Sequence, residues 1–222
     1  SLMNKKIFFF LFLFLIFPKF IWAEILPFEE PYCENKLSQS NLINLYKVKI
    51  KDIEVKIIKD RKWKKNSLRI FIGNFRFIPD KYKKWFKANI IVSFENDLQC
   101  VFKAKVKFHG DQKDHIIFKN NSIAQSLDVH LSTGHIYGIT KFILLLEHTR
   151  GQPEDLIFLS ELLRQLNYIT PRTMFIETKV NDASSKMIFQ EKAVKELLEY
   201  NLRRDGPIYE GDERYLWRLA QK

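Results

Sequence analysis

The stretch KANIIVSFENDLQCVFKAKVKFHG, residues 87–110, decides the fold class because apolar and polar residues alternate along it. Its second half separates into an apolar set and a lysine set, Phe102, Ala104, Val106 and Phe108 against Lys103, Lys105 and Lys107. A period of two is typical of a strand with one face in the core and the other in water. The stretch therefore predicts an antiparallel pair of strands in a sheet with one solvent-facing side.

Short apolar runs elsewhere predict more strands of the same sheet. They are LYKVKI (45–50), IEVKII (53–58), SLRIFIG (67–73), SLDVHL (126–131), KFILLLEH (141–148) and a hairpin over 171–193. Turn-forming residues separate several of these runs, as expected for connected strands. We therefore expect an antiparallel sheet that accounts for most of the ordered chain.

The period changes to that of a helix over 153–166, which begins with Pro153 followed by two acids. Its leucines recur at spacings of three and four and predict one apolar face, formed by Leu156, Leu159, Leu163 and Leu166. A second helix is expected over 192–204, because Asp205-Gly206-Pro207 is a stop signal. Many strands with few helices predict an α+β fold.

The amino-terminal residues 1–23 have the pattern of a secretory signal peptide. Asn4-Lys5-Lys6 precede eleven apolar residues, Ile7 to Phe17, and Ala23 is a small residue at a suitable cleavage point. A membrane anchor is the weaker alternative, because a bilayer needs roughly 20 apolar residues. We expect an exported protein, periplasmic or extracellular, with a leader or linker over 24–44 and one domain over 45–222.

The chain is basic, with 37 Lys and Arg against 26 Asp and Glu and a formal net charge of +11. Nine Lys or Arg and three acids fall within 47–65. This stripe could attract anionic polysaccharide, phosphate or anionic lipid. The favoured interpretation is a solvated strand face, because the lysines alternate with Tyr46, Val48 and Ile50. Nucleic acid is not an expected partner, because net charge is its only support and export argues against it.

Cysteine and histidine give little support for a metal site. The two cysteines, Cys33 and Cys100, could pair in an exported chain, or Cys33 could be a free thiol in the leader, and the sequence leaves both open. The five histidines lack the helical spacing of a zinc protease. His109 and His115, which flank two aspartates, form the only tempting cluster, and we expect loop and edge positions for them.

Residues from about 85 to 213 resemble the spore coat protein H (CotH) family of secreted kinase-like proteins. Four blocks carry the resemblance, KANIIVSFENDLQCVFKAKVKFHGD (87–111), YGITKFILLLEHTRGQPEDLIFLSELLRQLNYITPRTMFIETKVND (137–182), FQEKAVKELLE (189–199) and DGPIYEGDE (205–213). They look like that family's paired strands ending in Gly, its Leu-rich strand with helix and Pro-Arg-Thr strand, its strand ending in Glu, and its Gly-x-x-Tyr element. The match covers somewhat over half of the chain.

The resemblance implies the amino-terminal lobe of an atypical protein kinase, which binds ATP with Mg²⁺ or Mn²⁺ and phosphorylates secreted proteins. Hairpin 171–193 would precede the hinge, and Glu191 would lie beside the adenine pocket. Without the resemblance, Glu191 is a simple helix-start acid. Gly110 would begin a loop near the nucleotide phosphates.

Glu161 is the residue that the resemblance assigns to a phosphate-binding ion pair, because it lies in mid-helix off the leucine stripe. The competing interpretation is an exposed helix residue that pairs with Arg164 or Gln165. The lysine that should face it is missing, since Gln125 and Ser126 stand where the family has Lys-Ser and the nearest lysine is Lys119.

Two further departures bear on activity. Gly110-Asp111-Gln112-Lys113 replaces the family's Gly-Asn-Ser-Ser, so an acid would lie near any phosphate. The family's catalytic and metal-binding aspartates follow the Gly-x-x-Tyr element, and the sequence ends at Lys222, soon after it. We therefore expect no activity from the chain as it stands, whether it is a fragment or a reduced protein. The alternative is a non-catalytic envelope protein that binds anionic polysaccharide or lipid through the basic residues 47–65.

Overall fold

The computed structural model describes residues 32–35, 49–119 and 121–209. The main sheet contains β1 (Tyr32–Asn35), β2 (Ile50–Ile57), β3 (Phe86–Phe94), β4 (Leu98–Phe108), β7 (Leu127–Leu131), β8 (Lys141–Leu146), β9 (Thr173–Val180) and β10 (Ala183–Glu191). A separate hairpin is formed by β5 (Ile116–Lys119) and β6 (Ser122–Gln125), and the helices are α2 (Asp60–Ile72), α3 (Pro153–Gln165) and α4 (Lys195–Tyr200). The predicted α+β class, a mostly antiparallel sheet with few helices, is confirmed.

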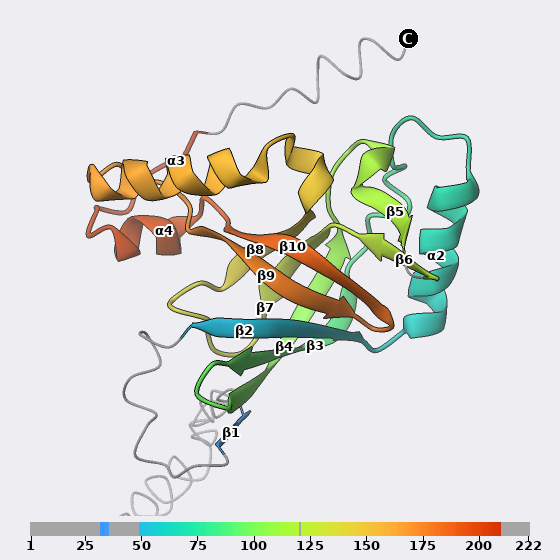
Figure 1. Cartoon of the computed structure of the whole chain (residues 1–222), viewed down its shortest axis with the longest axis horizontal. Coiled ribbons are helices and arrows are strands. Elements are labelled where there is room, and N and C mark those ends of the chain that lie inside the picture. The colour runs from blue at the N-terminus through green and yellow to red at the C-terminus, as the bar shows by residue number, and fades with distance from the viewer. Residues whose placement is uncertain (1–31, 36–48, 120, 210–222) are drawn as a thin grey trace, which may run out of the picture. The chain divides into compact units, whose positions relative to one another are not determined.

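The main sheet closes on itself. Its strand order is β4-β3-β2-β9-β10-β8-β7, and β7 pairs back onto β4, so seven strands of the described chain form a barrel (Figure 1). Neighbouring strands run antiparallel except at one seam, where β2 pairs in parallel with β9. Closure leaves none of these seven strands with an open edge.

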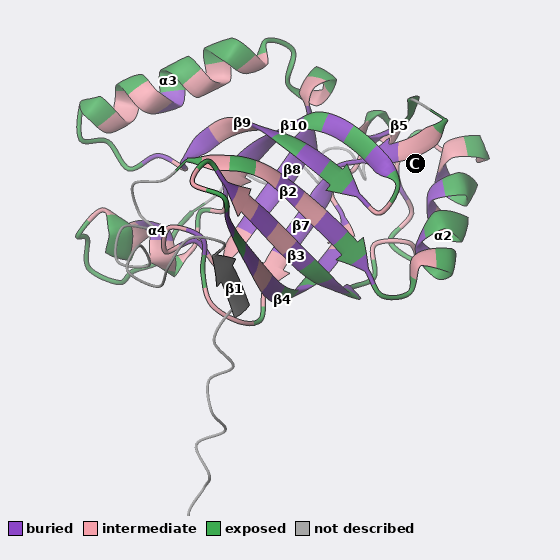
Figure 2. Cartoon of the chain, turned by 60° about the horizontal axis from the view of Figure 1, so that its bottom comes forward, coloured by how far each residue is buried: buried purple, intermediate pink, exposed green. Residues whose placement is uncertain are grey.

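The barrel core follows the alternation of the sequence. The predicted apolar set of β4 is buried, and so are the alternate apolar residues of β2 and β3, Ile53, Val55, Ile57, Phe86, Ala88, Ile90 and Val92. Buried and exposed residues accordingly alternate along the strands in Figure 2. The lysine set of β4 lies on the outer surface, which confirms the prediction of one solvent-facing side.

Helix α2 lies where a strand was predicted over 67–73, so that prediction was wrong. Trp63, Ser67 and Ile70 recur at helical spacing and are its buried residues. The Trp63 ring stacks on Phe108 at 4.0 Å between centroids and meets the edge of Phe86 at 5.2 Å. Tertiary packing against the barrel therefore favours a helix in this segment, and the local sequence pattern could not indicate that packing.

Helix α3 confirms the predicted helix over 153–166 but not its predicted apolar face. Its buried residue is Ser160, while Leu159 and Leu166 keep 51% and 58% of their surface exposed. The helix lies over the outer side of β9 and β10 (Figures 1 and 2), and outward-pointing residues of the sheet form a small second apolar cluster. A small serine at the contact lets the helix approach the sheet closely.

The remaining boundaries differ in detail. The second helix is shorter than predicted, since α4 covers Lys195–Tyr200 rather than 192–204. Strand β1 lies within the predicted leader and pairs with β4, with Cys33 directly opposite Cys100. Cys100 is disulfide-bonded, and Cys33 is the other cysteine of the chain. The predicted signal segment lies outside the described residues.

None of the described helices combines the length and the apolar character that crossing a membrane requires.

Candidate functional site

Lysines gather on the outer surface of the barrel around β4. We call this surface the basic face, and it consists of Lys87, Lys103, Lys105, Lys107, His130, Lys141 and Lys192. They come from β3, β4, β7 and β8 and from the residue that follows β10. All of them belong to outward positions, because their strand neighbours along the chain fill the core.

Strand register turns the basic face into a continuous row. Lys87 of β3 lies opposite Lys105 of β4, Lys105 lies opposite His130 of β7, and His130 lies opposite Lys141 of β8. The backbone N–H of Lys192 donates to the carbonyl of Lys141 at 3.0 Å, which extends the row. Like charges directly opposite each other on neighbouring strands are destabilising. Lys87 and Lys105 therefore place two positive charges opposite each other at a cost in stability.

A buried carboxylate, that of Asp128, forms ion pairs with lysines at one edge of the basic face. Asp128 is 4% exposed although it points outward, and its Oδ2 lies 2.9 Å from Lys192 Nζ and 3.7 Å from Lys107 Nζ. His130 Nε2 lies 3.4 Å from Asp128 Oδ1. Burial lowers the pKa of His130, and the nearby lysines lower it further against the opposing effect of Asp128. Burial is thus the largest influence on the pKa of this histidine, and Asp128 opposes it.

An aromatic ring lies against the same group. Trp85, which precedes β3, has its ring centroid 4.4 Å from that of His130, and Lys107 Nζ lies 4.7 Å from the Trp85 centroid. The indole keeps 40% of its surface exposed. The lysines of β4 share one face in the sequence pattern, but Trp85 and His130 could not be predicted as part of this surface, because only the pairing of the strands brings them together.

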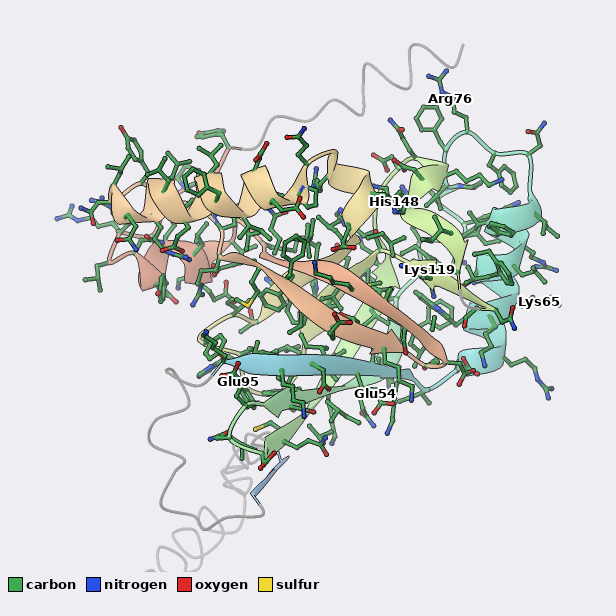
Figure 3. All side chains as sticks on the ribbon, viewed as in Figure 1. Glu54, Lys65, Arg76, Glu95, Lys119 and His148 are labelled. Carbon is green, nitrogen blue, oxygen red and sulfur yellow. The ribbon has the colours of Figure 1, made fainter. Side chains whose placement is uncertain are left out.

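The basic stripe predicted over 47–65 does not form one strand face. Its described part divides between β2 and α2, which point different residues to solvent. On β2 the outward Lys56 pairs with Glu54 at 3.2 Å (Glu54 is labelled in Figure 3), and on α2 Lys64 pairs with Asp60 at 2.8 Å. These pairs involve two of the stripe's nine basic residues, and the lysines of β3, β4 and β8 form a separate basic surface.

Glu161 occupies the position of an ordinary helix surface residue. It forms an ion pair with Arg164 and accepts a hydrogen bond from Gln165 Nε2 at 2.8 Å. Both partners are those that the competing interpretation named. The described contacts of Glu161 include no lysine.

Glu191 ends β10 in a buried ion pair. Its Oε2 accepts from Arg172 Nε and its Oε1 from Arg172 Nη2, both at 2.8 Å, and the two residues are 2% and 6% exposed. Arg172 Nη1 also donates to the carbonyl of Tyr137 at 2.6 Å, and its guanidinium lies over the Tyr200 ring. Glu191 therefore joins β9, β10, the loop before β8 and α4.

Gly110 follows β4 at the opposite end of the barrel from Glu191. Its φ is +86°, and the His115 ring occupies the space that a Cβ would take. Burial lowers the pKa of His109 to about 4 and also lowers the pKa of His115, so both rings are neutral near pH 7. The three predicted site residues, Gly110, Glu161 and Glu191, are not brought together by any contact among the described residues.

Gln125 and Ser126, which stand where the resemblance expects Lys-Ser, are both buried. With its amide oriented to satisfy both partners, Gln125 accepts from the Trp63 indole N–H and donates to the Ile123 carbonyl. Ser126 Oγ accepts from the backbone N–H of Leu146 at 3.0 Å. The pair therefore links α2, β6 and β8, and its position is occupied by structural contacts.

A pocket of about 360 Å³ lies at this end of the barrel. Its lining includes Lys119 and His148, both labelled in Figure 3, together with Lys186 and two glutamates, Glu147 and Glu154. Ser185 also lines it, and its Oγ is buried with no hydrogen-bond partner in the described structure. The pocket could receive a small polar ligand of either charge.

No group of three or more His, Cys, Asp or Glu residues in the described ranges has an arrangement that could hold a metal ion. No protein-family model matches the chain, and no curated protein matches it either. Function is therefore argued from the geometry of the described surfaces.

Proposed function

We propose that this protein is an exported, non-catalytic binding protein that holds an anionic polysaccharide on its basic face. The row Lys87–Lys105–His130–Lys141 carries the proposal, because it gathers lysines of neighbouring strands and sets the like charges of Lys87 and Lys105 directly opposite each other. A ligand with negative charges would relieve this repulsion on binding. The buried Asp128 is the acid in contact with this face among the described ion pairs.

The spacing of the charges favours a polymer. Neighbouring strands lie about 4.8 Å apart, and the lysines of the row are distributed over three strands, with Lys87 on β3, Lys105 on β4 and Lys141 on β8. A chain with repeating negative groups could contact several lysines at once, and each additional contact would be made at high effective concentration. A single small anion would contact one or two lysines and gain little at an exposed surface.

Export, the other part of the proposal, is supported by the disulfide at Cys100. Disulfides persist in oxidising compartments and are rare in reducing ones. An anionic polysaccharide of the cell envelope would be encountered in such a compartment.

The test measures binding of the purified protein to a uronic-acid polysaccharide such as polygalacturonate, by calorimetry at several salt concentrations. We expect affinity that falls as salt rises, because screening weakens contacts between exposed charges. The double variant Lys87→Gln/Lys105→Gln should lose about tenfold in affinity, since each exposed ion pair contributes up to about 1 kcal/mol.

The matched control is Lys62→Gln/Lys65→Gln, which removes the same charge from exposed positions of α2. Equal losses in the two double variants would mean that net charge alone attracts the polymer, and they would overturn the basic face as the site. No binding by the unmodified protein at low salt would overturn the proposed function.

Nucleotide binding, as the resemblance implies, is the second candidate. The pocket of about 360 Å³ that includes Lys119, Lys186 and the unpartnered Ser185 hydroxyl favours it, because a nucleotide would bring phosphates and hydroxyl groups. Calorimetry with ATP, with and without Mg²⁺ or Mn²⁺, tests it. Metal-dependent binding that is lost in Lys119→Gln, a residue that lines this pocket, would support a kinase-like lobe, and no binding at millimolar ATP would remove this candidate.

A further inference from the structure

Trp85 stands out from the other exposed apolar residues because of its neighbours. Most large exposed apolar side chains lie on α3, α4 and the segments after them. Trp85 instead contacts His130 and Lys107, two members of that face, and keeps 40% of its surface exposed. The exposed part of the indole is therefore not needed for packing within the protein and is available to contact a ligand.

The charges around the ring are held in place. Lys107 lies near the indole through a cation–π contact and near Asp128 through an ion pair. Asp128 is buried and also holds Lys192 at 2.9 Å. The positions of these ammonium groups relative to the ring are therefore restricted before any ligand arrives, which lowers the entropic cost of binding.

We propose that Trp85 is a stacking platform for one sugar ring of the anionic polysaccharide, with Lys107 and Lys105 holding the acidic groups of that ring and of its neighbours. This inference rests on the proposed function and adds the residue that contacts the sugar ring. A sugar ring presents a face of C–H groups that packs on an indole, and its carboxylate reaches the lysines beside it.

Other polyanions fit this combination less well. Inorganic polyphosphate carries charge at every unit but has no apolar face to place on an indole. An anionic bilayer would match the charges, but membrane-surface binding also needs several apolar side chains to enter the interface. The strand positions around Trp85 on the basic face are lysines and a histidine, so this face does not offer the several neighbouring apolar side chains that insertion into a membrane interface needs.

The test compares three probes by calorimetry and sedimentation: oligogalacturonate, polyphosphate of similar charge, and vesicles of mixed neutral and anionic phospholipid. Trp85→Ala should weaken oligogalacturonate binding roughly three- to tenfold, as expected for the loss of one aromatic contact. The same variant should bind polyphosphate as the unmodified protein does. Trp85→Phe, which keeps an aromatic ring, should recover most of the lost affinity, and its thermal unfolding should match that of Trp85→Ala.

The outcomes separate this inference from the proposed function. If the unmodified protein binds neither polymer, the proposed function fails and the inference fails with it. If it binds both and Trp85→Ala changes neither affinity, or lowers both equally, the basic face stands and the platform is overturned. Binding to vesicles that exceeds binding to oligogalacturonate and depends on Trp85 would also overturn it, in favour of a lipid surface.

Discussion

At the residue scale, Gly110 is the position where both backbone and space require glycine. Its φ of +86° disfavours any side chain, and the His115 ring lies where a Cβ would be. We expect Gly110→Ala to lower the free energy of unfolding by about 1–3 kcal/mol. Urea unfolding measures the change.

Alanine variants of two other glycines distinguish backbone strain from steric clash as the cause of that loss. Gly138 has a φ of +80°, and no heavy atom lies within 4 Å of the position that a Cβ would take, so Gly138→Ala carries backbone strain without a clash. Gly206 has neither feature, and Gly206→Ala should leave stability nearly unchanged. If Gly110→Ala were no worse than Gly206→Ala, the close contact with His115 would be incorrect.

The pH dependence of stability is also decided at single residues. Burial lowers the pKa of His109 from 6.5 to about 4, so between these values the unfolded chain binds more protons than the folded one. Stability contributed by the neutral ring is complete above pH 6.5 and is lost as pH falls toward 4. We expect urea unfolding midpoints to fall from about pH 7.5 to about pH 5, with a shallower fall in His109→Gln. An identical slope in the variant would contradict this assignment.

At the scale of elements, the Arg172–Glu191 ion pair joins the two strands of the β9–β10 hairpin and ties them to α4. Replacing Glu191 with Gln leaves the buried guanidinium without a counter-charge. Breaking a buried pair in this way typically costs about 3–5 kcal/mol. Thermal unfolding of Glu191→Gln should therefore show a large loss.

Glu161→Gln is the control, because it makes the same chemical change in an exposed pair on α3. It should alter stability by less than about 0.5 kcal/mol. Similar losses in the two variants would show that the Arg172–Glu191 pair carries no special role in joining these elements.

The elements also show what the sequence could predict. The strands of β3, β4, β7 and β8, the hairpin 171–193 and helix α3 follow from their periods, and the structure has them. Helix α2 could not be predicted, because its buried face depends on tertiary packing. Trp63 packs against Phe108 and Phe86 of the barrel, and Ser67 and Ile70 lie on the same buried side of the helix. The lysines of β4 were visible in the sequence, but the basic face needed the register of four strands.

At the scale of the whole molecule, the disulfide at Cys100 joins the segment before the barrel to the barrel itself. Cys33 lies opposite Cys100 in the β1–β4 register, so the bond closes a long loop. Its loss should lower the free energy of unfolding by about 4 kcal/mol on the chain-entropy model. We expect a lower unfolding temperature in reducing agent, and Cys100→Ser should reproduce it. A further drop when Cys100→Ser is itself reduced would point to some other effect of the reductant.

The single parallel seam of the barrel has a consequence for how the chain folds. β2 and β9 meet through pairs such as Val55 with Val180, so the ring closes only when segments from opposite halves of the chain come together. Asn181 helps fasten the seam, because its Oδ1 accepts from the Ile57 N–H at 2.8 Å and its N–H donates to the Val55 carbonyl at 2.9 Å. Contacts so distant in sequence slow folding, since the entropy of closing the intervening chain is lost before they form. A nascent chain therefore cannot complete its barrel until residue 181 has emerged, and until then the unpaired edges of β2 and β8 are available to chaperones or to aggregation.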